Sequence, residues 1–458
     1  MNMGKWTVFC AAGAMACGAM AANDKYVDWQ WKAVEVQDKD ADSNVRNQMD
    51  FTVPVHGPWL TLPSEAGMTV TWITRVNCAG GIAYREKGAT NWVERWPVAC
   101  GLIDYSKDVH CHHLSGLKPA TEYEYQLLSN MSANDTAYHM ILARSREIRS
   151  FKTLDQKRQN YKVFLTSDFH GGGRLCIDPM IDRSGAADAD FFFFLGDNVE
   201  DGMYNDIRYF TTFGFLDDVT RKWGQFKPTI FMRGNHDIAG RDAGKYGEYF
   251  PQPDGKTYYA FRQGPCFFVA IDTLWPRSEK LQQEQYLKYL AEQAEWLKNL
   301  KRSKDWQASV FRVVMFHVPM FPGEGMKDPY KFFGEILADE SKEGRVHAVL
   351  AGHEHEYARV NPNTKETRVA KHLNRDPKKY PSRYLKASQI PDRFPYVSVL
   401  CNLCEAMTIQ VSPEKLEFRS HDVSTAEGKL FDAFAVHPDG KVEDLIETTA
   451  FPFGAARR

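Results

Sequence analysis

Residues 191–198 read FFFFLGDN, and this stretch decides the fold of the chain. Its four phenylalanines and one leucine form an apolar run that is too short to span a membrane. A run of this length that ends in a turn signal is typical of a strand buried on both faces of a sheet. A carboxylate directly after such a strand lies at the edge where open α/β folds place their sites. Asp197 is therefore either a site residue or the cap of a following helix.

Four further apolar runs end in the same kind of side chain. Runs 163–167, 230–233, 313–316 and 348–351 are followed by Asp-Phe-His, Gly-Asn-His-Asp, His and Gly-His-Glu-His. A hydrophobic core does not need this pattern, because a buried polar group costs free energy unless it is satisfied. Five strands that deliver such groups to one edge therefore predict a metal site. The candidate ligands are Asp168, His170, Asp197, Asn235, His317, His353 and His355.

The chemistry of these ligands indicates the metals. They offer carboxylate, amide and imidazole donors and include no cysteine, which suits manganese, iron or zinc better than calcium. Seven ligands are too many for one ion. We therefore expect two divalent metal ions that share a bridging carboxylate and lie about 3.5–4 Å apart.

Composition and the N-terminus bound the class of protein. The chain has 458 residues, of which 43% are hydrophobic, and a net charge of −2, which fits two or three globular domains without a general attraction to nucleic acid. Residues 1–22 are typical of a secretory signal peptide, because Lys5 precedes the apolar run 6–20. We expect a secreted, periplasmic or cell-surface protein without a transmembrane segment. A lipid anchor at Cys17 is the alternative.

Two segments precede the predicted catalytic region. Residues 23–50 are polar and are expected to form an extension over the surface. Residues 51–154 are expected to form an all-β domain, because residues 68–73 alternate with the period of a half-buried strand. Tyr123 follows the turn at Pro119 and matches the tyrosine corner of immunoglobulin-like sandwiches. This segment resembles a fibronectin type III module.

Cysteine and histidine clusters outside the strand-end pattern are not expected to bind metal. Strand alternation divides His-Cys-His-His at 110–113 between two faces. The CxxC at 401–404 has no second pair, so we expect packing or a local disulfide there. An oxidising compartment would permit one disulfide among Cys78, Cys100 and Cys111.

Residues 160–440 alternate predicted strands with helices, which favours a layered α/β fold with two mixed sheets. Helical periodicity is present at 205–223 and 279–301. Residues 365–386 form a basic insertion, which is either a solvated loop or a cover over the site that attracts an anionic substrate. Residues 441–458 are expected to be a tail.

The ordered set of motifs resembles the calcineurin-like metallophosphoesterases over residues 163–357. The resemblance implies a four-layer α/β/β/α sandwich after the immunoglobulin-like β domain, and a two-metal hydrolase of phosphoric esters. It also implies ligand roles. Asp168, His170 and His355 would hold the first metal, Asn235, His317 and His353 the second, and Asp197 would bridge them.

The β module, followed by His353-Glu-His355-Glu-Tyr357-Ala-Arg359, further resembles the purple acid phosphatases. The ligand set departs from that branch at two positions. Glu200 stands where those enzymes have a tyrosine ligand, and they usually lack the histidine found here at His170. We therefore expect no purple colour and no fixed preference for iron(III).

The resemblance predicts hydrolysis of phosphate monoesters by a metal-bound hydroxide, in the manner of acid phosphatases. His236 is the candidate general acid, and Asp237 is the candidate to orient it. Candidate phosphate contacts are Asn235, His236 and Arg233, with Arg174 and Gly171–Gly173 on the loop after His170. The substrate would be a small phosphorylated molecule or a phosphoprotein, and not a nucleic acid. The alternatives are a phosphodiesterase on the same site and a non-catalytic extracellular binding protein.

Overall fold

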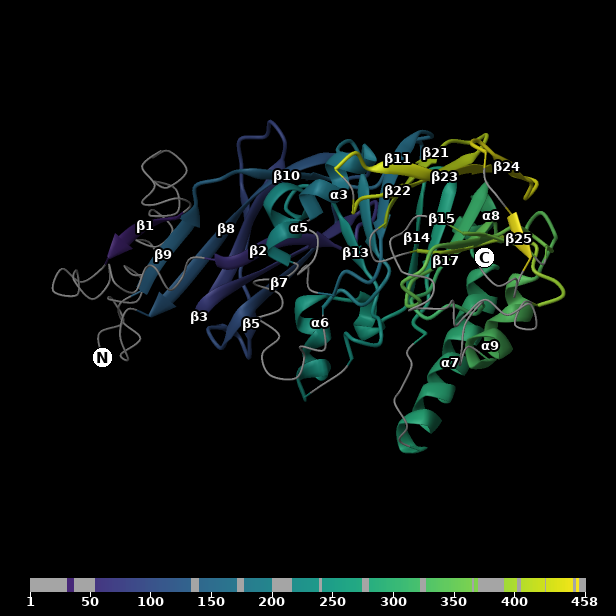
Figure 1. Cartoon of the computed structure of the whole chain (residues 1–458). Helices are drawn as coiled ribbons and strands as arrows, with labels where there is room; N and C mark the ends of the chain where they lie inside the picture. Colours follow the sequence, from purple (N-terminus) through teal and green to yellow (C-terminus); the bar gives the residue numbers. More distant parts are fainter. Residues whose placement is uncertain are drawn as a thin grey trace. The chain divides into compact units, whose positions relative to one another are not determined.

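The computed structural model (Figure 1) divides the chain into two compact units. The first comprises residues 1–153 with 223–226, and the second comprises residues 154–222 with 227–458. The described residues are 31–36, 54–132, 140–170, 177–199, 216–238, 241–273, 280–321, 327–364, 366–369, 391–401, 405–424, 426–447 and 450–452. Predicted features outside them are the signal peptide with Cys17, most of the extension 23–50, Gly171–Gly173, Arg174, Glu200, Cys404 and most of the basic insertion 365–386.

The described residues up to 153 form strands and no helix, which confirms the predicted all-β region. Its strands are β1 (Trp31–Val36), β2 (Pro54–Thr61), β3 (Gly67–Glu86), β4 (Val93–Arg95), β5 (Val98–Ala99), β6 (Leu102–Ile103), β7 (Lys107–Ser115), β8 (Glu122–Ser132), β9 (Met140–Ser145) and β10 (Arg149–Lys152). The long strand β3 pairs with β2, β4, β7 and β8, so it links most of the unit. Trp72, Tyr125 and Phe151 lie in its buried core.

The structure shows the contact of the predicted tyrosine corner and a strand in the predicted extension. The Tyr123 hydroxyl accepts a hydrogen bond from the Lys118 backbone N–H at 2.9 Å, which is the contact expected of a tyrosine corner. The polar segment before residue 50 does more than cover a surface, because its described part, β1, pairs antiparallel with β9. The extension therefore contributes a strand to the sheet.

The disulfide that an oxidising compartment would permit in this unit is not formed in the structure. Cys78, Cys100 and Cys111 are all free thiols. Cys78 is buried and its sulfur lies 3.6 Å from both Thr74 Oγ1 and His110 Nε2, so its environment is filled by polar side chains. His110 Nε2 also lies 2.9 Å from Thr74 Oγ1, and this contact gives the histidine a structural partner.

The second unit consists of two mixed sheets. The first sheet has the order β13 (Thr229–Phe231), β12 (Phe191–Phe194), β11 (Tyr161–Thr166), β21 (Glu405–Val411), β22 (Leu416–Asp422), β23 (Lys429–Val436) and β24 (Val442–Asp444). The second has the order β14 (Tyr259–Gln263), β15 (Cys266–Ala270), β16 (Phe311–Met315), β17 (Ala348–Ala351), β20 (Val397–Leu400), β18 (Ala358–Val360), β19 (Glu366–Val369) and β25 (Ala450–Pro452). The segment predicted as a tail thus supplies β24 and β25 as sheet strands.

The main helices of this unit are α3 (Ile177–Ser184), α6 (Tyr246–Tyr249), α7 (Lys280–Leu300), α8 (Lys304–Ala308) and α9 (Lys327–Leu337). A short helix α5 (Leu216–Val219) continues as a π-helical turn at Thr220–Gly224. Of the predicted helices, 279–301 matches α7, whereas residues 205–215 lie outside the described chain. Among the helices that the structure describes, none is long and apolar enough to cross a membrane.

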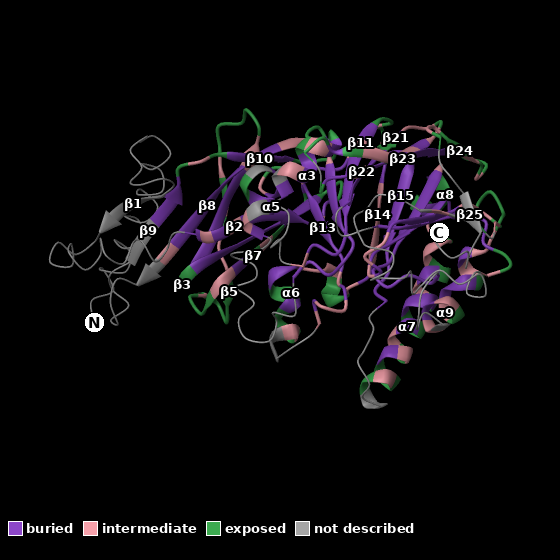
Figure 2. Ribbon diagram, viewed as in Figure 1, coloured by how far each residue is buried: buried purple, intermediate pink, exposed green. Residues whose placement is uncertain are grey.

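Side-chain alternation along the strands explains the layers. Phe268 points between the two sheets, where it joins Phe193 of β12 in a shared core. Its neighbours Phe267 and Val269 point to the opposite face and pack with residues of α7 and α9. Helix α3 contacts β21 and β22 of the first sheet. Both sheets are buried on their faces (Figure 2), which confirms the predicted α/β/β/α sandwich.

The parallel strands of the two sheets bring the predicted ligands to one edge. β11, β12 and β13 pair in parallel, and so do β15, β16 and β17. Asp168 and His170 follow β11, Asp197 follows β12, Asn235 follows β13, His317 follows β16, and His353 and His355 follow β17. Because the carboxyl ends of parallel strands meet at the same edge, these loops converge.

Candidate metal centre

The loops that carry the candidate ligands have an unusual backbone. Five of these residues adopt left-handed conformations, which non-glycine residues rarely do. They are Asp168 (φ 54°), His170 (φ 50°), Asp197 (φ 49°), His353 (φ 74°) and His355 (φ 54°). Each such residue costs about 1–3 kcal/mol and persists only where surrounding contacts impose it. Strain concentrated at five convergent side chains marks a functional site.

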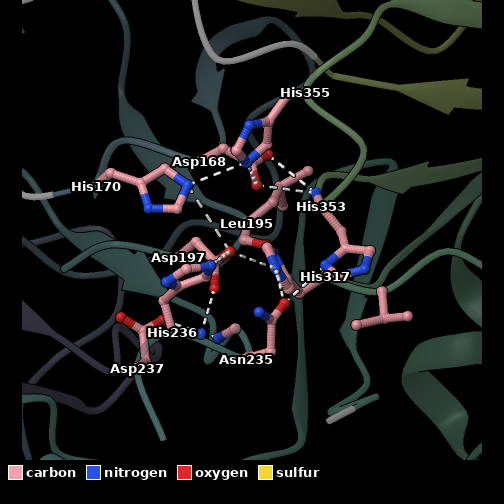
Figure 3. A network of polar contacts seen from close by, with 12 residues as sticks. Asp168, His170, Leu195, Asp197, Asn235, His236, Asp237, His317, His353 and His355 are labelled. Carbon is pink, nitrogen blue, oxygen red and sulfur yellow. Dashed lines mark hydrogen bonds and ion pairs between the residues drawn. The ribbon is translucent and has the colours of Figure 1, made fainter. Parts of the chain in front are cut away.

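One group of side chains gathers at the end of β11. Asp168, His170, Asp197 and His355 each place a possible ligand atom within 4.8 Å of the others. His355 Nε2 lies 3.3 Å from Asp168 Oδ1, and the Nε2 atoms of His170 and His355 are 3.0 Å apart. Figure 3 shows these side chains pointing toward one another.

A second group lies beside it and shares Asp197. Asp197, His317 and His353 form the second set of possible ligands, with His317 Nε2 3.2 Å from Asp197 Oδ2. Asn235 Oδ1 lies 2.6 Å from His353 Nδ1 and 3.2 Å from His317 Nε2. The structure therefore brings all seven predicted ligands together in two adjoining groups.

The orientation of the His317 ring is fixed by a contact of its second ring nitrogen. Its Nδ1 lies 2.8 Å from the Leu195 carbonyl oxygen, to which it can donate, and this contact leaves Nε2 facing Asp197. Gly196 makes this approach possible, because a Cβ at this position would collide with the His317 ring. A metal-binding histidine is commonly held in this way by a second contact.

Backbone N–H groups also join the loops after β11, β12, β13 and β17. The His353 backbone N–H donates to both carboxylate oxygens of Asp168, at 3.0 and 2.9 Å. The His170 N–H donates to the Asp197 carbonyl at 2.9 Å, and the His236 N–H donates to Asp197 Oδ1 at 2.8 Å. These contacts hold the left-handed residues in place.

The electrostatics of the site favour a cation. Burial alone would raise the pKa of the Asp168 carboxyl, but the hydrogen bond and charge of His355 hold it below its usual value. Burial opposes protonation of His317, yet the Asp197 carboxylate raises its pKa to about 9. Burial lowers the pKa of His353 to about 4, which keeps its imidazole neutral and able to bind a metal.

Asp197 provides the most direct test of whether the site fits metal ions. Its Oδ2 atom is buried and accepts no hydrogen bond from any described residue. It is nevertheless surrounded by the Nε2 atoms of His317, His170 and His236, at 3.2, 3.9 and 3.9 Å. A buried carboxylate that faces imidazoles of both ligand groups is placed where a bridging cation would balance its charge. The residues present therefore fit two divalent metal ions.

His236 lies at the open side of this arrangement. Its ring stands edge-on to His170, with centroids 4.6 Å apart, and its side chain is 21% exposed. His355 is 28% exposed, whereas Asp168, Asp197 and His317 are buried. A substrate that approaches from the solvent would thus reach His236 and His355 first.

The structure corrects the expected use of Asp237. This carboxylate is buried and accepts from the backbone N–H groups of Gly234, Asn198 and Val199, at 2.8, 3.3 and 3.0 Å, and from the Asn198 side-chain amide at 3.2 Å. Among the described residues, the His236 side chain is not one of its hydrogen-bond partners. Asp237 therefore joins two loops rather than orienting the histidine. Burial and the charge of Asp197 raise its pKa to about 7.

Arg233 also differs from expectation. Its guanidinium donates to Asp272 Oδ2 from Nε at 3.0 Å and from Nη2 at 2.7 Å. The arginine is therefore bound to a buried carboxylate, and these two nitrogens are not available to a phosphate. Asp272 was missed by the sequence reasoning, although the signal was present. It follows the apolar strand β15 just as the ligands follow their strands.

Comparison with known proteins agrees with this geometry. Residues 161–357 match the family model of the calcineurin-like phosphoesterases. The chain carries a calcineurin-like phosphoesterase domain. The match covers all seven candidate ligands, and this family implies a metal-dependent phosphoester hydrolase with two metal ions. A comparison with curated proteins gave no match.

Solved structures share the fold of this chain. A purple acid phosphatase, PPD1, from yellow lupin (Lupinus luteus) seeds has a TM-score of 0.56 and 16% identity, over 83% of this chain and 74% of that one. A structure of PhoD has a TM-score of 0.54 and 12% identity, over 87% and 93%. At such identities the likeness shows a common fold and does not transfer a substrate.

Proposed function

We propose that this protein is a secreted phosphomonoesterase that uses two divalent metal ions, in the manner of acid phosphatases. The observation that carries the proposal is the buried Asp197 Oδ2 atom, which lies 3.2, 3.9 and 3.9 Å from imidazoles of three other loops. Of these imidazoles, His317 belongs to one ligand group and His170 to the other, which is the arrangement that a bridging carboxylate requires.

The ligands divide naturally into two sets. Asp168, His170 and His355 would hold one ion, and their ligand atoms lie on one side of Asp197. Asn235, His317 and His353 would hold the other, and Asp197 would bridge the two. Manganese, iron or zinc suits this donor set. When bound, two such ions would neutralise phosphoryl charge and lower the pKa of water to near neutrality.

The chain's own residues would orient the substrate and move a proton. His236 stands at the solvent-facing side, next to His170, where the leaving oxygen of an entering phosphate ester would lie. In its protonated form, it would donate a proton to that oxygen as the P–O bond breaks and the electron pair passes to the leaving alcohol. Asn235 and His236 would also contact the phosphate from the same turn.

Three finer assignments belong to this proposal. The monoester preference and the acid-phosphatase character rest on the resemblance of the motifs to purple acid phosphatases. The secreted location, which includes periplasm or cell surface, rests on the signal-peptide pattern of residues 1–22. The β unit would be a fibronectin type III-like module, supported by the Tyr123 contact with Lys118. The substrate would be a small phosphorylated molecule or a phosphoprotein.

Ester hydrolysis by metal-free and re-metallated protein tests the proposal. The protein is stripped of metal, reloaded separately with manganese, iron and zinc, and assayed with p-nitrophenyl phosphate and bis-p-nitrophenyl phosphate. We expect metal-dependent cleavage of the monoester and its loss in Asp197→Ala, with bound metal measured in parallel. The control is Asp339→Asn, which removes an ion pair with Lys301 remote from the ligand loops. A diester preference would instead assign a phosphodiesterase, and no turnover with any metal would contradict an esterase.

A further inference from the structure

The turn that carries Asn235 and His236 is held by several contacts. The Met232 carbonyl accepts from the Asn198 amide at 2.7 Å and from the Tyr246 hydroxyl at 3.1 Å, and the His236 N–H donates to Asp197. A further anchor is the Arg233 guanidinium, which directly precedes the turn and is tied to Asp272. This contact links the turn to the segment after β15, which carries none of the seven candidate ligands.

The Arg233–Asp272 ion pair is held by several hydrogen bonds. Two guanidinium nitrogens, Nε and Nη2, donate to the same oxygen of Asp272. The Asp272 side chain is fully buried, while the arginine side chain is 19% exposed. Thr257 Oγ1 donates to the same carboxylate and lies 3.3 Å from Arg233 Nη2, so it contacts both members of the pair. Two charge-assisted contacts that converge on one buried oxygen hold the guanidinium close to the carboxylate.

Asp272 is in turn fixed by helix α7. The Gln293 side chain, which is buried, accepts from the Asp272 N–H at 2.8 Å and donates to the Asp272 carbonyl at 2.9 Å. The next residue, Thr273, donates from its hydroxyl to the Val318 carbonyl at 2.8 Å, directly after the ligand His317. These contacts connect the end of β15 to α7 and to the loop of the second metal group.

We infer that Asp272 is a positioning residue, which acts through Arg233 to set the turn that carries Asn235 and His236. The chain of contacts runs from Gln293 on α7 to Asp272, then to Arg233 and then to the turn. In this role, Arg233 and Asp272 would act through the turn and not by contact with the substrate. The inference rests on the proposed function, because it treats His236 as the proton donor to the leaving group.

This assignment gives a kinetic signature that a purely structural role would not. A misplaced proton donor slows esters with poor leaving groups, because they need a proton as the P–O bond breaks, and hardly affects those with good ones. Loss of folded protein or of metal lowers both rates by the same factor. The ratio of kcat/KM for 2,4-dinitrophenyl phosphate to that for phenyl phosphate therefore reports the position of His236.

The experiment compares Asp272→Asn with the wild type at saturating metal, so that weaker binding through Asn235 does not contribute. We expect kcat/KM for phenyl phosphate to fall by about 10- to 100-fold, the usual range for residues behind metal ligands. The fall for 2,4-dinitrophenyl phosphate should be at least about tenfold smaller. The matched control is Asp339→Asn, which removes the 2.8 Å ion pair with Lys301 just after the C-terminus of α7 and should leave the ratio unchanged.

Two further variants keep the inference testable if Asp272→Asn does not fold. Gln293→Met removes both contacts to Asp272 and should shift the ratio in the same direction by a smaller factor. In an Arg233→Gln background, Asp272→Asn should cause no further change, because the second residue acts through the first. Equal losses on both esters, or independent multiplying effects of the two substitutions, would overturn the inference. A wild type inactive on every ester would instead refute the proposed function itself.

Discussion

Replacing Asp237 with alanine should destabilise the protein strongly, because one carboxylate joins two loops. Four hydrogen bonds reach it from Gly234, Asn198 and Val199, and none of its surface is exposed. At about 1.5 kcal/mol for each bond to a charged group, the sum would be about 6 kcal/mol. Two effects reduce this value. Water can enter the vacated space, and the burial cost that raises the pKa of Asp237 to about 7 disappears. We expect a net loss of about 3–4 kcal/mol.

Urea unfolding of the metal-free protein measures this loss without a contribution from bound ions. The control is Asp305→Ala, since the Asp305 side chain is 63% exposed and should change stability by less than about 0.5 kcal/mol. Asp237→Ala should also lower kcat, because the loops that Asp237 joins carry Asp197 and Asn235. A loss below about 1 kcal/mol for Asp237→Ala would refute the view that this carboxylate holds the loops together.

Three other outcomes follow from the structure. Gly234→Ala should abolish activity, because its Cβ would collide with the backbone and carboxylate of Asp197, whereas Gly244→Ala, in open space, should leave activity unchanged. Stability should decline as the pH falls from about 6.5 to about 4, because burial lowers the pKa of His347 to about 4 and the unfolded chain takes up its proton first. His347 contributes roughly 3 kcal/mol to this loss, and His347→Gln should make that part of the pH profile measured by urea unfolding less steep. Iron-loaded protein should be colourless in its visible spectrum, since Glu200 replaces a tyrosine ligand, and an intense charge-transfer band would contradict this.

The ligands could be predicted from the sequence because their signal is local. An apolar run that ends in Asp, Asn or His places that side chain at a sheet edge, whatever the rest of the chain does. The run before Asp197 shows this most clearly, because all four phenylalanines of β12 are buried. The fold followed from the same alternation of short strands with amphipathic segments such as α7.

The roles of neighbouring residues could not be predicted, because they depend on contacts between distant loops. Arg233 directly precedes a catalytic motif, yet its partner Asp272 lies 39 residues away in the sequence. Asp237 directly follows His236, but its partners are loop amides, including two residues after β12. Disulfide formation could not be predicted for a similar reason, since the spacing of cysteines in the sequence does not indicate which side chains surround a thiol. Cys78 lies beside His110 and remains free.

The proposed mechanism requires two metal ions bridged by Asp197. Calorimetric titration of the metal-free protein with manganese, followed by the rate of p-nitrophenyl phosphate hydrolysis at each addition, tests this directly. We expect two bound equivalents per chain, with activity rising mainly on the second, and weakened binding of both in Asp197→Asn. A single equivalent, or full activity without metal, would contradict it.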